Sequence, residues 1–122
     1  RKSGTAEQPI TLRNYPEETP IIIPGTGLAQ RVELNAEYII VEGFEIQGGY
    51  DGIKIYKSNN TIRNNYVHNN KFTGILVAAT TGEISNVLIE NNVVESNGFE
   101  PGTGDPYPGI SLKNVHGIYI SD

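Results

Sequence analysis

The sequence predicts an all-β protein, a right-handed parallel β-helix (a solenoid) of about four to five coils with uncapped ends. Three observations predict it. One short phrase recurs along the chain, and a second phrase recurs between its copies. Apolar and polar residues alternate within both phrases, which is the period of a strand. Gly, Pro and Asn interrupt every window in which a helix could form.

The first phrase consists of an apolar residue, three mostly polar or small residues, a variable position and a β-branched residue. Its copies start at Val41, Ile62, Ile89 and Ile120, so they lie 21, 27 and 31 residues apart. A repeat of this length cannot bury its apolar face alone and stacks on its neighbours. We therefore expect two stacks of equivalent residues in the core: Val41 with Ile62 and Ile89, and Ile46 with Val67 and Val94.

The second phrase predicts a further strand in each coil. Its copies are residues 52–55, 74–77 and 109–112, and each starts with Gly-Ile. Because strand residues alternate between the two faces, every second residue should point into the core. The expected core residues are Ile53, Ile55, Ile75, Val77, Ile110, Leu112 and Ile120. The outward residues should form two rows: Lys54, Leu76 and Ser111, and then Tyr56, Ala78 and Lys113.

Asparagines mark the corner inside the first phrase. Alignment of its copies places Phe44, Asn65 and Asn92 at one position, and Asn64 and Asn91 just before them should face solvent. Asn tolerates the left-handed conformation of a tight corner, and its amide can bond the backbone there. Stacked amides can also bond to one another in an Asn ladder. We interpret Asn65 and Asn92 as structural corner residues rather than ligand-binding residues.

The chain reads as a single domain, with a lead-in and first strands in residues 1–35 and the repeated coils in residues 36–122. Insertions lie between the two phrases at residues 47–51, 68–73 and 95–108, and loops on one face of a repeat protein commonly build its binding surface. No cap is visible at either end. We expect either a longer protein or head-to-tail self-association through the open ends.

Composition excludes several classes of protein. The net charge is −5 and no basic run exists, so nucleic acid is not an expected partner. No apolar stretch is long enough for a membrane span. The chain has no Cys, so it has neither a disulfide framework nor a Cys metal site. A hydrophobic content of 37% suffices for the narrow apolar column of a solenoid.

Residues 4–22 resemble the lead-in of bacterial right-handed β-helix proteins of the pectate-lyase-like superfamily, and residues 36–122 are similar to its general coil repeat. The resemblance implies a secreted, extracellular or cell-surface polysaccharide lyase. Its substrate would be an acidic glycan such as pectate, alginate or chondroitin, cleaved by β-elimination. Epimerases, glycoside hydrolases, phage tailspikes and non-catalytic surface proteins share the repeat, so the fold by itself assigns no activity.

A lyase of this kind must neutralise the uronate carboxylate, remove the adjacent proton and stabilise the developing charge. The resemblance implies that Ca²⁺ or basic residues do the first task, and that Lys or Arg does the second. Ca²⁺ is therefore a possible cofactor, although the only aspartates are Asp51, Asp105 and Asp122, and they form no cluster in the sequence. The catalytic candidates are Lys54 and Lys113, and the metal candidates are Asp51, Glu100 and Asp105.

Aromatic side chains beside lysines suit an acidic sugar chain, because rings stack on sugar faces and Lys pairs with uronate. The substrate-binding candidates are Tyr50, Tyr56, His68, Lys71, Phe99, Tyr107 and Ser111. Each of them also fits an ordinary solvated strand or loop. Two classes of function therefore stay open: a polysaccharide lyase, and a non-catalytic module that binds carbohydrate at a surface or stacks end to end into a fibre.

Overall fold

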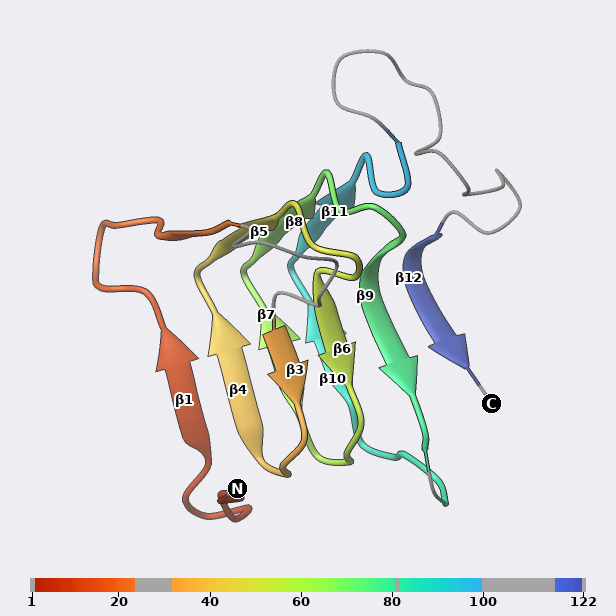
Figure 1. The fold of residues 1–122 in the computed structure, drawn as a ribbon. Coiled ribbons are helices and arrows are strands. Elements are labelled where there is room, and N and C mark those ends of the chain that lie inside the picture. Colours follow the sequence, from red (N-terminus) through yellow and green to blue (C-terminus); the bar gives the residue numbers. More distant parts are fainter. Residues whose placement is uncertain (1, 24–31, 81, 100–115, 122) are drawn as a thin grey trace.

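The computed structural model of the protein describes residues 2–23, 32–80, 82–99 and 116–121, and for residues 116 and 121 it describes only the backbone. All regular structure in these residues is β-strand (Figure 1). The strands are β1 Ile10–Arg13, β2 Ile21–Ile22, β3 Val32–Leu34, β4 Ile39–Glu42, β5 Glu45–Gln47, β6 Ile53–Ile55, β7 Thr61–Arg63, β8 Tyr66–His68, β9 Thr73–Ala78, β10 Leu88–Glu90, β11 Val93–Glu95 and β12 His116–Ser121.

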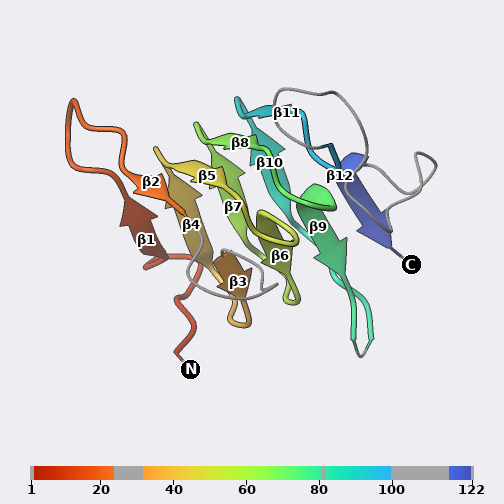
Figure 2. The same ribbon diagram turned by 45° about the horizontal axis from the view of Figure 1, so that its top comes forward.

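These strands form three four-stranded parallel sheets, with one strand of every coil in each sheet (Figures 1 and 2). Sheet A has the order β1-β4-β7-β10, sheet B β2-β5-β8-β11, and sheet C β3-β6-β9-β12. Every paired strand lies one coil from its partner, so the chain winds as a solenoid. The prediction of an all-β parallel β-helix is confirmed, with four coils.

The apolar column runs through the coils as the first phrase predicts. Val41 lies in register with Ile62, and Ile62 with Ile89. Ile46, Val67 and Val94 are likewise in register. The fully buried side chains of this column include Val41, Ile46, Ile53, Ile55, Ile62, Val67 and Ile75, while Ile89 and Val94 are half-buried against them.

The last strand contradicts two sequence predictions. Ile118 pairs with Ile75 and Ile120 with Val77, so the third described Gly-Ile strand is residues 117–120 and not 109–112, which lie outside the described residues. Ile120 therefore belongs to sheet C and does not start a fourth copy of the first phrase. Its register with the buried Val77 places it in the core column, as expected, and it is 69% exposed because β12 is an edge strand of sheet C. The two Gly-Ile segments look alike in sequence, and long-range pairing selects one.

The corner between sheets A and B is turned one residue earlier than predicted. The left-handed residues are Gly43, Asn64 and Asn91, with φ of 83°, 55° and 53°, and not Asn65 or Asn92. The reason is that one residue must reverse the chain while the next one directs its side chain inward. Asn64 and Asn91 are exposed, as expected.

Asparagine side chains bond one coil to the next at this corner. Asn65 Oδ1 accepts from Phe44 N at 3.0 Å, and Asn92 Oδ1 accepts from Asn65 N at 3.0 Å. Asn65 Nδ2 donates to Val41 O at 3.0 Å and to Asn92 Oδ1 at 3.2 Å. The side-chain amide thus replaces the backbone pairing that the strands lose where they bend.

The other two corners contain similar bonds that the sequence analysis missed. At the corner between sheets B and C, Asn70 Oδ1 accepts from Gly49 N, and Asn97 Oδ1 accepts from Asn70 N. At the corner between sheets C and A, Asn60 Oδ1 accepts from Ile39 N at 2.8 Å. Each Asn directly follows a residue with positive φ: Asn59, Asn69 or Ser96.

Close packing of the coils explains the Gly of the Gly-Ile phrase. A Cβ at Gly74 would lie 2.5 Å from Val94 Cγ1 and 2.7 Å from Gly117 O, and a Cβ at Gly52 would lie 2.6 Å from Gly74 O. Backbone from the next coil occupies the space that a side chain would need. This position therefore admits only Gly in both coils.

Candidate functional site

The outer face of sheet C carries the row of side chains in which the sequence placed a substrate groove. Register aligns Glu33 with Lys54, Lys54 with Leu76, and Leu76 with Tyr119. Tyr119 takes the place predicted for Ser111, and Ser121 pairs with Ala78 where Lys113 was expected. Ser111 and Lys113 themselves lie outside the described residues, and the places predicted for them in the two rows are taken by Tyr119 and Ser121.

Lys54 is the cation of this row. It occupies the middle of β6 between the buried Ile53 and Ile55, which forces its side chain outward, where it is half-buried. Its Nζ lies 5.2 Å from the centre of the Tyr56 ring, a cation–π geometry that steadies the ammonium. The ion pairs found within the described residues are Arg63–Glu42 and His68–Glu45, so Lys54 forms no described ion pair, and its neighbouring carboxylate in register is Glu33 on β3.

Aromatic side chains stand at the corner that leads into sheet C. The Tyr50 and Phe72 rings stack with centres 5.4 Å apart and planes 20° apart. Successive coils bring them together, because Phe72 N donates to Tyr50 O and Lys71 N donates to Gly49 O. Lys71 and Phe99 are half-buried. Phe99 lies two residues after Asn97, just as Phe72 lies two residues after Asn70. The stacked Tyr50–Phe72 pair and Lys71 therefore lie at the corner that leads into sheet C.

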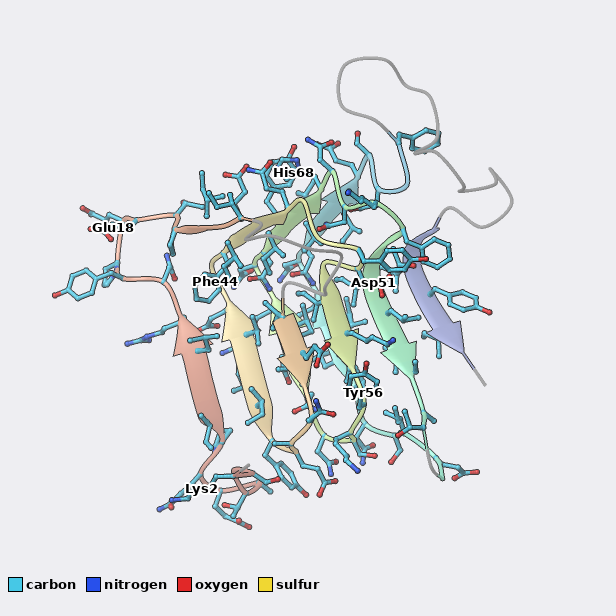
Figure 3. All side chains as sticks on the ribbon, viewed as in Figure 1. Lys2, Glu18, Phe44, Asp51, Tyr56 and His68 are labelled. Atoms are coloured by element: carbon cyan, nitrogen blue, oxygen red, sulfur yellow. The ribbon has the colours of Figure 1, made fainter. Side chains whose placement is uncertain are left out.

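Asp51 does not fit the metal role considered for it. Its side chain is 1% exposed, and its Oδ1 accepts a hydrogen bond from Thr73 N at 3.3 Å. Asp51 and Tyr56 stand at opposite ends of β6 (Figure 3). Across the described ranges, no group of three or more His, Asp or Glu side chains could hold a metal ion. The other two metal candidates, Glu100 and Asp105, lie outside those ranges, as does the substrate-binding candidate Tyr107.

His68 lies on the outer face of sheet B rather than beside Lys54 (Figure 3). It is buried against Tyr66, whose ring is parallel to within 15° at 4.0 Å between centres. His68 Nε2 lies 2.7 Å from Glu45 Oε1, and the Tyr66 hydroxyl donates to Glu95 Oε1 at 2.7 Å. The hydrogen bond to Glu95, followed by burial and the nearby negative charges, raises the pKa of Tyr66. Sequence spacing gave no signal for this cluster, because its members come from three coils.

A known protein family matches most of this chain. The family described as "Right handed beta helix region" matches residues 29–122, which is most of the chain and includes the described strands β3 to β12. The chain belongs to this family. Its parallel sheets and coil-to-coil register are the architecture that the family description names.

One curated relative is similar over much of the chain. Pectate lyase L of Paenibacillus polymyxa (strain SC2) is 33% identical over 110 residues, which cover 81% of this chain and 24% of the relative. The chain thus spans about a quarter of that relative's length. No solved structure gives a significant match. Among the described residues, no helix is long and apolar enough to cross a membrane.

Proposed function

We propose that this β-helix is the glycan-binding part of an extracellular polysaccharide lyase, and that an acidic glycan lies across the outer face of sheet C. The position of Lys54 carries the proposal: it is a lysine on a strand face, it lies beside the Tyr56 ring, and it forms no ion pair within the described residues. The similarity to a pectate lyase supports a substrate with uronate groups.

The geometry of the face suits such a chain. Outward positions of successive coils lie about 4.8 Å apart along the solenoid axis, so a glycan running along this axis meets Lys54 and then Tyr119, on either side of Leu76, which is only 9% exposed. The Lys54 ammonium pairs with a uronate carboxylate, and Tyr119, which is 42% exposed, offers an aromatic surface to a sugar. The stacked Tyr50–Phe72 pair borders the corner next to this face.

In β-elimination a base takes the proton on the carbon next to the uronate carboxylate, and the electron pair forms a carbon–carbon double bond. The glycosidic C–O bond breaks on the other side, and the leaving oxygen takes a proton. We assign Lys54 to the uronate, where its charge stabilises the negative charge that develops on the carboxylate. In its neutral form the same amine is a candidate for the base.

The test measures binding and elimination separately. The parent chain and its Lys54→Ala, Lys54→Arg and Lys57→Ala variants are titrated with polygalacturonate, alginate and chondroitin by calorimetry. Elimination is followed through the ultraviolet absorbance of the unsaturated product. Lys57 is the matched control, because it is exposed one residue beyond Tyr56 and only its backbone oxygen is bonded, to Asn60 Nδ2.

We expect Lys54→Ala to weaken binding of one of these glycans roughly tenfold, and Lys57→Ala to bind like the parent. If Lys54 is the base, Lys54→Arg keeps binding and loses elimination. Binding without any new absorbance in the parent supports the alternative, a non-catalytic carbohydrate-binding module. Unchanged binding in Lys54→Ala overturns the proposal.

A further inference from the structure

A cleft of about 700 Å³ lies at the corner between sheets A and B, and none of its lining residues belongs to sheet C. It runs across all four coils, from Arg13 on the first to Val93 on the fourth. With about 4.8 Å per coil, its length is roughly 14 Å. That is enough for a short oligosaccharide rather than a single small ion.

The outer wall of this cleft is the segment 14–20, which makes a wide excursion between β1 and β2 and carries Glu18 at its outer side (Figures 2 and 3). Both ends of the segment are bonded to the second coil. Asn14 N donates to Glu42 O at 3.2 Å, and Glu45 N donates to Pro20 O at 3.1 Å. Asn14 Nδ2 also donates to Glu18 O at 2.6 Å, so the excursion is braced internally. The wall therefore stands in place before any ligand arrives.

Tyr66 forms the opposite wall, and its ring is fixed on two sides. Its hydroxyl is held by Glu95, and His68, itself held by Glu45, stacks on the ring. Tyr66 lines the cleft and His68 does not, so His68 covers one side of the ring and the other side faces the cleft. A 36% exposed ring held in this way loses little freedom on binding and offers a flat apolar surface.

Amide side chains and the apolar residues Phe44 and Val93 both line the cleft. Asn64 and Asn91 are the left-handed corner residues of successive coils, and both line the cleft. Their side-chain amides are exposed and have no hydrogen-bond partner within the described part of the chain. Of the charged residues that line the cleft, Arg13 and Glu42 have opposite signs and face each other in register. Glu42 is also paired with Arg63. Amides that can donate and accept, beside an aromatic ring, match the hydroxyls and C–H faces of a neutral sugar.

We propose that this cleft is a second glycan site and binds a neutral oligosaccharide, with Tyr66 as the stacking platform and the Asn64 and Asn91 amides as hydrogen-bonding groups. The site is separate from the outer face of sheet C and does not depend on the function proposed for it. The charge balance separates the two sites: Lys54 favours a uronate chain, whereas Glu45 and Glu95 behind Tyr66 disfavour one.

The experiment is a titration of the ¹⁵N-labelled chain, followed by nuclear magnetic resonance of the backbone and Asn side-chain amides. The probes are soluble cello-, manno- and galacto-oligosaccharides, with oligogalacturonate as the acidic comparison. We expect at least one neutral probe to shift the Asn64, Asn91 and Gly43 signals, and oligogalacturonate to leave them in place.

Variants then test the platform. Tyr66→Ala should weaken neutral-probe binding roughly tenfold, and Tyr66→Phe should keep it within about threefold because the ring remains. Tyr15→Ala is the control, because Tyr15 belongs to the wall segment 14–20 but its exposed ring does not line the cleft. Asn91→Gly removes an amide while preserving the left-handed backbone, so it weakens binding without the risk of misfolding. Lys54→Ala leaves the cleft unaffected. The proposal is overturned if no neutral probe shifts the cleft signals, if oligogalacturonate binds there more tightly, or if Asn91→Gly and Tyr66→Ala both bind like the parent.

Discussion

Replacement of Asn65 by Leu tests whether the corner amides stabilise the solenoid. Leu has nearly the same size, but it can neither accept from Phe44 N nor donate to Val41 O, and both bonds are 3.0 Å long in buried surroundings. An unsatisfied buried backbone group costs about 1–3 kcal/mol. Two such groups predict a loss of about 2–6 kcal/mol in the free energy of unfolding, which is a large part of the stability of a small domain.

The assay is urea unfolding followed by circular dichroism, with the free energy extrapolated to water and the slope compared between variants. The control is Asn64→Gly, which changes the preceding exposed residue and accommodates its φ of 55° without strain. We expect this control to stay within about 0.5 kcal/mol of the parent. If Asn65→Leu is as stable as Asn64→Gly, the amide bonds are not a significant source of stability and the reasoning fails.

Four further predictions concern core packing, the contact between coils, the ionisation of Tyr66 and the edge strand β12. Ile62→Ala, at the fully buried centre of the column, should cost about 2–5 kcal/mol by urea unfolding, and a loss below about 1 kcal/mol would contradict a close-packed core. Gly74→Ala should cost at least about 1–3 kcal/mol in the same assay, because its Cβ meets backbone of the next coil; a neutral result would mean that the coils can separate. The pKa of Tyr66 is raised by its hydrogen bond to Glu95, so its contribution to stability is present below the pKa of an unfolded Tyr and is lost as pH rises through the folded value. Comparison of the parent with Tyr66→Phe in an alkaline unfolding series checks this sign, since the Phe variant should lose less stability there. Finally, Ile120→Lys should reduce self-association of the 122-residue chain in sedimentation velocity, because Ile120 is 69% exposed on the edge strand β12; identical sedimentation of parent and variant over a wide concentration range would show that this edge does not associate.

Much of the fold could be predicted from local patterns. Alternation with period two marks strands, and the repeated phrase aligned Val41 with Ile62 and Ile46 with Val67, because equal numbers of residues between corners bring equal positions into register. The same pattern put Lys54 on an outer face, since its two neighbours are isoleucines that must be buried. Local chemistry also located the corner between sheets A and B to within one residue.

Other features depended on tertiary structure. Residues 109–112 and 117–120 both begin with Gly-Ile, and only pairing with β9 selects the second segment, which puts Tyr119 beside Leu76. The burial of Asp51 follows from its bond to Thr73 in the next coil. The Glu45–His68 and Tyr66–Glu95 pairs join residues 23 and 29 positions apart. Alternation and repetition are local properties, so they can be read from the sequence. Loop length and packing across many residues set which segment of one coil pairs with which segment of the next, so this pairing could be seen only in the structure.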